Sequence, residues 1–195
     1  SESFLYTADD EKKIICLDNN EFSVFNFTKK IESKNYKKPP TIIIGDVKNK
    51  NKIEKLIKDN KPDIVIHAAA HKHVSLSENN PDEAINTNIF GTKNVIDVSY
   101  KNKVKYFLLI STDKAVEPSS LMGLTKFISE RYCFNYLNKK DFNVSIIRFG
   151  NVLSSNGSVV PIFEEKIRER QEIEVTHKNV ERYFMLPNEA VSLVL

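Results

Sequence analysis

Short runs of apolar, largely β-branched residues recur along this chain and alternate with longer amphipathic stretches. Apolar strands separated by helices are typical of a parallel sheet that is covered on both faces. Because crossovers between parallel strands are right-handed, such a sheet becomes doubly wound. The sequence therefore predicts an α/β fold built on a doubly wound parallel sheet. The expected strands are KIICL (13–17), TIIIGD (41–46), DIVIHAA (63–69), VKYFLLIST (104–112), VSIIRFG (144–150) and EIEVT (172–176).

Two long helices are expected between these strands. Residues 80–100 carry Pro81 and two acidic residues in the first turn, and their apolar residues repeat at approximately helical spacing. Residues 119–140 begin with two serines that can cap a helix. Further along, residues 154–172 predict a loop followed by a helix, and residues 187–195 predict the start of another helix.

The composition argues against several other classes of protein. A chain of 195 residues, 41% hydrophobic and 28% charged, is long enough for one well-buried core. The lysine-rich segments 29–38 and 48–61 could contact nucleic acid, but solvated helix faces are the preferred interpretation at a net charge of +3. Cys16 and Cys133 lie far apart and predict neither a disulfide framework nor a zinc site, which suits a reducing cytoplasm. No apolar run reaches the roughly 18 residues that a membrane span needs, so this segment is expected to be soluble.

Polar and small residues follow three of the expected strands. Ligands of doubly wound sheets bind at the carboxyl ends of the strands. Asp18 is therefore placed to accept hydrogen bonds from a ribose, and Asp46 is similarly placed for an adenine amino group. The alanines at 68–70 would let a flat cofactor lie against the backbone. Together these residues predict a dinucleotide site.

The segment HAAAHKHV (67–74) also contains three histidines, which raises the question of a metal site. No carboxylate or cysteine accompanies them at a recognised ligand spacing. We therefore expect no metal at this position. The glycine-rich loop that holds the pyrophosphate of a dinucleotide is also absent from residues 1–13, and we expect that loop to precede Ser1.

The order of the motifs resembles the extended short-chain dehydrogenase/reductase superfamily. Within it, the chain is most similar to the UDP-N-acetylglucosamine 4,6-dehydratases of capsule and flagellin-sugar biosynthesis. The matching segments are LDNNEF (17–22), GDV (45–47), HAAAHKHV (67–74), NTNIFGTKNV (86–95), STDKAVEPSSLMGLTK (111–126), RFGNVLSSNGSVVP (148–161) and VTHKNVERYFMLPNEAVSLVL (175–195).

This resemblance implies a Rossmann-like NAD(P)-binding domain over residues 1–150, without its first strand and glycine-rich loop. Residues 151–195 would form part of a small substrate-binding region. It also implies a UDP-sugar substrate, NAD or NADP as cofactor and a homo-oligomer, with no nucleic acid or membrane partner for this segment. The implied cofactor-binding residues are Asp18, Asn19, Asp46, Val47, Ala68, Ala69, Ala70, Asn88 and Lys126. The implied substrate-binding residues are His71, Lys72, Asn151, Ser155 and Arg182, the last because a guanidinium matches phosphate geometry.

The reaction that the resemblance implies oxidises the C4 hydroxyl, removes the C5 proton, expels the C6 hydroxyl and returns hydride to C6. Thr112 matches the residue that hydrogen-bonds the C4 oxygen. Asp113 and Lys114 match the acid at C6 and the base at C5. To act in this way near neutral pH, Asp113 would have to retain a proton and Lys114 would have to lose one.

Met122 occupies the position of the tyrosine that usually exchanges a proton with the C4 hydroxyl, four residues before Lys126 and on the same helix face. A thioether carries no proton to exchange. Tyr136 and Lys140 repeat the tyrosine-lysine spacing, but they lie too far along the expected helix and are interpreted as structural. Met122 is similar to the residue in a subset of these dehydratases. Two hypotheses follow: Lys126, its pKa lowered by a neighbouring nicotinamide, works through Thr112 and a water, or Lys114 serves both steps.

Two other functions remain open at this stage. A UDP-hexose 4-epimerase of the same fold would leave the C6 oxygen in place. A non-catalytic module that binds sugar nucleotides would explain Met122 and the missing glycine loop. Asp18 favours NAD over NADP, because a carboxylate repels a 2′-phosphate.

Overall fold

The computed structural model describes residues 13–34, 36–153, 159–173, 179 and 181–194. All paired strands in this part of the chain are parallel. One sheet pairs β1 (Ile15–Asp18) with β2 (Thr41–Ile44), and a second has the order β3 (Ile64–His67), β4 (Tyr106–Thr112), β5 (Asn143–Phe149). A short third sheet pairs β6 (Asn151–Val152) with β7 (Phe184–Met185). The predicted α/β class with parallel strands is confirmed.

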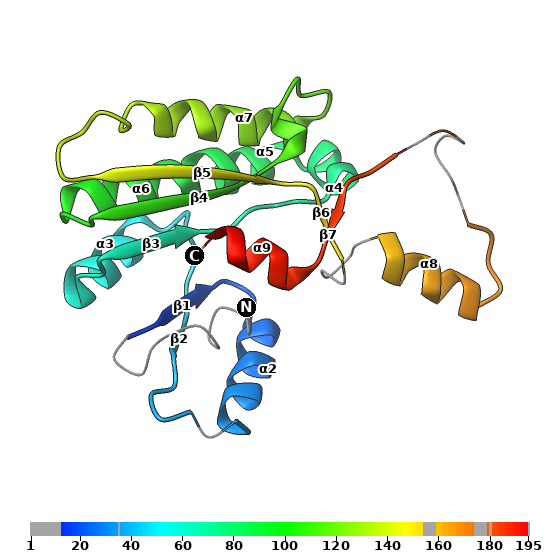
Figure 1. Ribbon diagram of the computed structural model, residues 1–195, viewed down its shortest axis with the longest axis horizontal. Coiled ribbons are helices and arrows are strands. Elements are labelled where there is room, and N and C mark those ends of the chain that lie inside the picture. The colour runs from blue at the N-terminus through cyan, green and yellow to red at the C-terminus, as the bar shows by residue number, and fades with distance from the viewer. Residues whose placement is uncertain (1–12, 35, 154–158, 174–178, 180, 195) are drawn as a thin grey trace.

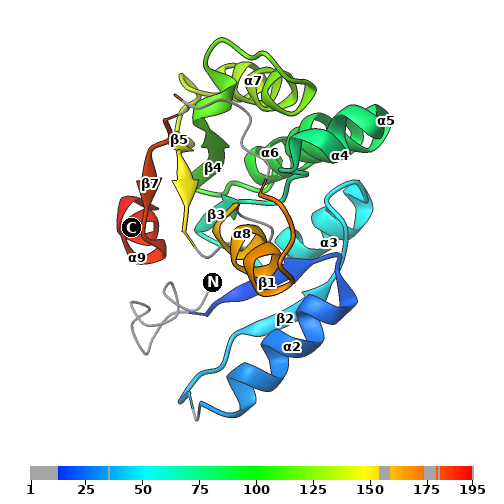
Figure 2. The same ribbon diagram turned by 90° about the vertical axis from the view of Figure 1, so that its right-hand side faces the viewer.

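The main sheet is divided, whereas the sequence predicted one continuous sheet. Among the described residues, β1 and β3 share no ladder of hydrogen bonds. Both views place β1 nearer to β3 than β2 is, so the strands follow the order β2, β1, β3 across the division (Figures 1 and 2). On β3, the apolar residues Ile64 and Ile66 are exposed instead of buried.

Only part of the expected sixth strand, residues 172–176, lies in the described part of the chain. Residues 172 and 173 belong to no strand, and the remaining three lie outside the described part of the chain.

Helices cover both faces of the second sheet. In Figure 1, α6 (Thr92–Lys101) and α7 (Leu121–Phe134) lie along one face of β4 and β5, and α9 (Pro187–Val194) lies on the other. The core is centred on Phe107 and Leu109 of β4 and on Ile96 and Val98 of α6. The remaining α-helices of the described residues are α2 (Glu21–Glu32), α3 (Lys50–Asn60), α4 (Val74–Asn79), α5 (Pro81–Ala84) and α8 (Val159–Arg168). No helix in the described residues is both long and apolar enough to cross a membrane.

The helix expected over residues 80–100 is present but contains a π-helical segment, η1 (Ile85–Gly91). The hydroxyls of Thr92 and Ser129 both donate to the carbonyl of Asn88, at 2.6 and 2.7 Å. Side chains that bond to a backbone carbonyl in this way interrupt the regular ladder of an α-helix, and π-helical turns are frequent at functional sites.

The helix expected over residues 119–140 is shorter than predicted. It begins after the N-cap Ser120, as expected, but ends at Phe134. The chain then turns, and the Tyr136 hydroxyl donates to Asp97 at 2.7 Å. Tyr136 and Lys140 therefore lie beyond α7 and do not share a helix face. The contact with Asp97 gives Tyr136 a structural role.

Candidate active site

Three of the predicted catalytic residues meet at the carboxyl end of β4. Thr112 ends this strand, and Asp113 and Lys114 begin the short 3-10 turn η2 (Asp113–Ala115). The Thr112 hydroxyl donates to Asp113 Oδ1 at 2.9 Å, and Lys114 Nζ donates to the same oxygen at 3.0 Å. Lys114 Nζ also lies 3.4 Å from Asn151 Oδ1, which brings one predicted substrate residue to the same cluster.

These contacts set the protonation state of Asp113. Partial burial pushes the pKa of this carboxyl upward, but the hydrogen bonds from Lys114 and Thr112 outweigh it, and the net pKa is below the ordinary value. Asp113 is therefore ionised near neutral pH. This differs from the sequence-based requirement that Asp113 retain a proton, because the sequence did not show two donors converging on one oxygen.

Met122 and Lys126 lie on α7 behind this turn. Both are buried, each with 4% of its surface exposed. Lys126 Nζ donates to the carbonyl oxygen of Ile110 on β4 at 2.7 Å. Burial lowers the pKa of Lys126 to about 8, against smaller opposing contributions from Cys133 and Glu130. Burial alone thus lowers this pKa, without the neighbouring cofactor charge that the sequence-based hypothesis invoked.

A glycine that sequence reasoning overlooked brings the turn and α7 together. A Cβ atom at Gly123 would lie 2.3 Å from the backbone oxygen of Lys114, too close for any side chain. The first turn of α7 is held further by Glu78 of α4, whose carboxylate accepts the Leu121 amide at 2.7 Å. The position of Lys114 relative to Met122 therefore depends on the missing side chain at 123.

The buried carboxylate of Glu130 holds together the strands beneath the site, and it was not predicted from the sequence. Glu130 of α7 is 1% exposed and accepts the Ser111 hydroxyl at 2.5 Å. Arg148 of β5 donates to both of its oxygens, with a closest distance of 2.6 Å. One side chain thus ties α7 to the ends of β4 and β5. The spacing of Glu130, four residues after Lys126, was the available signal for a shared helix face.

Asn88 supports the neighbouring loop. Its side chain is fully buried; it accepts from the His71 amide at 2.8 Å and donates to the His71 carbonyl and to Thr125 at 3.1 and 2.8 Å. These contacts tie the loop after β3 to α7. Asn88 was predicted among the cofactor-binding residues, but its observed contacts give it a supporting role within the protein.

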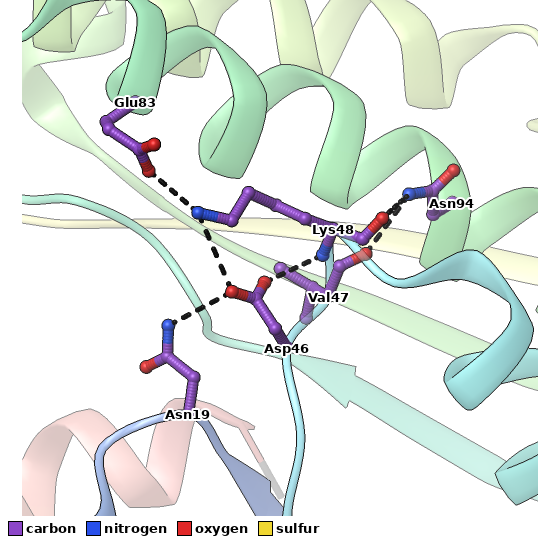
Figure 3. A network of polar contacts seen from close by, with 6 residues as sticks. All are labelled: Asn19, Asp46, Val47, Lys48, Glu83 and Asn94. Atoms are coloured by element: carbon purple, nitrogen blue, oxygen red, sulfur yellow. Dashed lines mark hydrogen bonds and ion pairs between the residues drawn. The ribbon is translucent and has the colours of Figure 1, made fainter.

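The ends of β1 and β2 form a second polar cluster at the sheet edge (Figure 3). Asn19 Nδ2 lies 3.4 Å from Asp46 Oδ2, and the Lys48 amide donates to Asp46 Oδ1 at 2.8 Å. The Lys48 ammonium lies 3.6 Å from Asp46 and 2.7 Å from Glu83 of α5. Asp18 accepts the Asn20 amide at 2.8 Å. The two predicted nucleotide carboxylates therefore stand at adjacent strand ends.

Val47 follows Asp46 but is oriented inward. It is buried, and a Cβ atom at Gly91 would lie 2.6 Å from its Cγ2. Asn94 donates to the backbone carbonyls of Val47 and Lys48, at 3.1 and 3.2 Å. The side chain of Val47 therefore packs against η1, and any contact of Val47 with a cofactor would involve its backbone.

The loop after β3 presents the predicted alanines. Ala68 and Ala69 are exposed and Ala70 is half-buried. Next to them is a cavity of about 210 Å³ lined by His71, Lys72, His73, Leu76, Ser77, Asn80, Glu83 and Ala84. Partial burial lowers the pKa of Lys72.

His67 belongs to the core and lies apart from this loop. Its ring is buried, Nε2 lies 2.9 Å from Thr92 Oγ1, and burial lowers its pKa to about 3. Groups of metal-ligating side chains are absent from the residues that the structure describes.

Arg182 and Ser155 are the remaining two predicted substrate-binding residues. Arg182 is exposed and donates to the backbone oxygen of its neighbour Glu181 at 2.8 Å. It precedes β7, whose Phe184 pairs with Asn151 of β6. Ser155 lies outside the described residues.

Comparison with curated proteins identifies several relatives. The chain is 45% identical over 190 residues to the capsular polysaccharide biosynthesis protein CapD of Staphylococcus aureus, covering 95% of this chain and 31% of that protein. It is 41% identical over 156 residues to a UDP-N-acetylglucosamine 4,6-dehydratase (inverting) of Campylobacter jejuni, covering 78% and 46%. A UDP-glucose 4-epimerase of Rickettsia canadensis is 39% identical over 155 residues, covering 78% and 45%. The chain thus spans about half or less of the length of these relatives.

Solved structures show the same fold. Pen from Bacillus thuringiensis superposes with a TM-score of 0.88 and 34% identity, covering 98% of this chain and 59% of that one. WbmH from Bordetella bronchiseptica, solved in complex with NAD+, superposes with a TM-score of 0.78 at 20% identity, covering 99% and 66%. These likenesses confirm the Rossmann-like fold.

The family profile described as "Polysaccharide biosynthesis protein" matches residues 4–195. This match covers both polar clusters at the sheet edge, together with the strands and helices that carry them. The chain therefore belongs to the polysaccharide biosynthesis protein family.

Proposed function

We propose that this chain carries the catalytic region of a nucleotide-sugar 4,6-dehydratase that acts on UDP-N-acetylglucosamine in surface polysaccharide biosynthesis. The observation that carries the proposal is the pair Asp113 and Lys114 in contact beside Thr112. Dehydration needs one group that removes the C5 proton and another that protonates the departing C6 hydroxyl. A 4-epimerase only removes and returns hydride at C4, so it has no use for this pair. The identity with the dehydratase of Campylobacter jejuni supports the assignment.

The proposed cofactor is NAD or NADP. Asp18 and Asp46 present carboxylates at adjacent strand ends, where they can accept hydrogen bonds from a ribose and an adenine amino group. Ala68 and Ala69 are exposed and Ala70 is half-buried, which leaves room for a flat ring beside the backbone. When bound, the cofactor takes up the hydride of the sugar and returns it. Asp18 favours NAD, because its negative charge would repel the 2′-phosphate of NADP.

The substrate is proposed to lie between the loop after β3 and the start of β6. His71 and Lys72 line the cavity on one side, and Asn151 lies beside Lys114 on the other. Residues 151–195 would contribute the remaining contacts with the sugar nucleotide, with Ser155 and Arg182 as candidates for the diphosphate. Residues 1–150 would hold the cofactor.

The test uses the full-length protein, incubated with UDP-N-acetylglucosamine and NAD+ or NADP+, and follows the mass of the sugar nucleotide. Loss of one water supports the dehydratase. An unchanged mass with inverted C4 configuration would instead favour a 4-epimerase, the second candidate, because the Rickettsia canadensis relative bears that name. Tight binding without turnover would mean a non-catalytic binding module.

A further inference from the structure

Three neighbouring loops form a surface at the amino ends of β3, β4 and β5, and we call it the basic loop surface. It consists of residues 61–63, 102–105 and 135–142. Backbone hydrogen bonds join the loops, since the Asp63 carbonyl accepts the Lys105 amide at 3.0 Å and the Lys105 carbonyl accepts the Asn143 amide at 2.8 Å. In Figure 1 these loops lie at the left end of the sheet, whereas β4 reaches the candidate active site at its right end. The two surfaces are therefore at opposite ends of the same strands.

The basic loop surface holds the net positive charge of the chain. Its acidic residues are Asp63 and Asp141. Its basic residues are five exposed lysines: Lys61, Lys103, Lys105, Lys139 and Lys140. The resulting charge of +3 equals that of all 195 residues, so the rest of the chain is neutral in sum. Within the described residues only Lys105 of these five forms an ion pair, with Asp63 at 2.8 Å, and the other four ammonium groups are available to an external anion.

Two of these lysines occupy backbone positions that favour glycine. Lys61 ends α3 with a φ of 46°, and Lys103 follows α6 with a φ of 60°. Residues with a side chain enter this left-handed region with strain, and helix ends of this kind usually carry glycine or asparagine. Strained residues of this kind cluster at functional sites. The chain thus retains positive charge at two positions where another residue would be more stable.

The longest of the three loops is held at both of its ends. The Tyr136 hydroxyl donates to Asp97 at 2.7 Å, and the Tyr136 ring meets the ring of the buried Phe142 edge-on, with centroids 5.9 Å apart. Between these two anchors, the side chains of Leu137, Lys139 and Lys140 are exposed. One apolar and two basic side chains are therefore presented on a loop whose ends are fixed.

Apolar side chains stand among the lysines. Leu137 is 49% exposed, Tyr106 at the start of β4 is 51% exposed, and Tyr100 in the last turn of α6 is 41% exposed. The Tyr100 ring lies 5.4 Å from the rings of both Tyr136 and Phe142, so it borders the same loop. Lysine, tyrosine and leucine side chains suit a lipid-water interface, where their apolar parts enter the headgroup region and ammonium groups meet phosphates. A soluble polyanion would use the lysines but gain little from an exposed leucine.

We propose that the basic loop surface docks on a membrane that contains anionic phospholipids. The four lysines without an ion pair contact lipid phosphates, and Leu137 and Tyr106 enter the headgroup region. Because the candidate active site lies at the other end of the strands, this orientation turns it away from the lipid and leaves it open to sugar nucleotide and cofactor in water. The resemblance implied no membrane partner for this segment, and that expectation did not consider where these loops lie. Docking does not depend on which reaction the active site catalyses.

The first test measures binding of the full-length protein to sedimented vesicles of phosphatidylglycerol or of phosphatidylcholine, at low and at high salt. Each lysine near an anionic surface strengthens binding by roughly fivefold. We therefore expect binding to phosphatidylglycerol to be at least about 100-fold tighter than to phosphatidylcholine, and the difference to disappear at high salt. Equal binding to the two kinds of vesicle, or binding to neither, would overturn the proposal.

Two variants with the same loss of charge show whether the position of the lysines matters. The first has glutamine in place of Lys61, Lys103, Lys139 and Lys140. The control has glutamine in place of four exposed basic residues elsewhere: Lys50, Lys52, Arg168 and Arg170. We expect binding to phosphatidylglycerol to weaken at least about 50-fold in the first variant and less than about fivefold in the control. Equal losses would mean that net charge alone drives binding, and the docking surface would be wrong. Circular dichroism and the affinity for cofactor, both expected to be unchanged in the first variant, show that it is folded.

Leu137→Ser distinguishes a lipid bilayer from a soluble polyanion. It removes apolar surface without changing the charge, so we expect binding to phosphatidylglycerol to weaken by about fivefold with the same salt dependence. Unchanged binding would contradict insertion into lipid. Displacement of the unmodified protein from the vesicles by an equal concentration of DNA phosphate, supplied as a duplex of mixed sequence, would mean that the lysines bind nucleic acid instead.

Hydrogen exchange locates the contact in the unmodified protein. Phosphatidylglycerol vesicles should slow exchange of the backbone amides in residues 102–105 and 135–142 and leave the turn after β4 unaffected. Protection at that turn, or no protection in the three loops, would place the lipid elsewhere and overturn the proposal.

Discussion

The two polar clusters at the sheet edge are held in different ways. Behind the Thr112–Lys114 turn stand buried polar side chains, with Glu130 1% exposed and Asn88 fully buried. The Asp18–Asp46 cluster is held by surface groups, since the Lys48 and Glu83 side chains are 34% and 51% exposed. Buried polar groups fix geometry at high cost if broken, whereas surface ion pairs contribute little to stability. The turn that would perform chemistry is thus rigidly supported, and the edge that would bind nucleotide is more adjustable.

The largest expected effect comes from breaking the buried support. Glu130→Ala removes the acceptor of Ser111 and Arg148 and leaves a cavity behind β4 and β5. Breaking a buried ion pair costs about 3–5 kcal/mol, and we expect the lower end, about 3 kcal/mol, because Arg148 is partly exposed. Urea denaturation of the full-length protein measures the loss. A loss below about 1 kcal/mol would contradict the distinction drawn between the two clusters.

A second expectation concerns the buried Lys126. Its pKa is about 8 in the folded state and 10.5 as the ordinary value, so above pH 8 the unfolded chain binds more protons than the folded one. Stability should therefore rise with pH between about 8 and 10.5, by roughly 3 kcal/mol in total at 1.36 kcal/mol per pKa unit. Burial raises the pKa of Cys133 to about 12, which lowers stability above pH 9 and opposes this trend.

The Lys126→Met variant isolates the contribution of Lys126. It should lose the rise above pH 8 and retain the fall that Cys133 causes above pH 9. The measurement is the free energy of unfolding at several pH values from 7 to 10.5, as the difference between the two proteins. Identical pH profiles would show that Lys126 is not desolvated in the folded state.

A third expectation concerns Gly123, where a substitution would displace Lys114 without removing any functional group. Gly123→Ala places a methyl group against the backbone of Lys114, which cannot move aside as a flexible side chain would. We expect the turnover number to fall by tenfold or more, because small displacements of reacting groups slow catalysis strongly. Gly45→Ala is the matched control, since its nearest neighbour is the side-chain carbon Leu17 Cδ1 at 2.8 Å. Equal losses in both variants would mean that the contact at 123 has no specific role.

The features of the two clusters that follow from chain order could be predicted from the sequence, and those that depend on packing between elements could not. Strands β1 to β5 and the meeting of Thr112, Asp113 and Lys114 at a strand end were predictable, because periodicity and chain order determine them. The pairing of Glu130 with Arg148 was not, since it depends on how α7 is rotated over β5. Nor was the end of α7 at Phe134, where the Tyr136 contact with Asp97 outweighs continued helix. The ionised state of Asp113 could not be predicted either, because it depends on the distances from this carboxylate to its two hydrogen-bond donors, Thr112 and Lys114.

The smallest effect is expected at the nucleotide edge. Glu83→Gln removes the partner of Lys48, and an exposed pair of this kind is worth a few tenths of a kcal/mol. The free energy of unfolding should therefore change by less than about 0.5 kcal/mol. Lys48 would still donate its amide to Asp46, so the affinity for cofactor, measured by calorimetry, should change less than about threefold, which corresponds to roughly 0.6 kcal/mol. A larger loss of affinity, with stability unchanged, would show that the Glu83–Lys48 pair holds Asp46 in place and that this edge is as firmly organised as the catalytic turn.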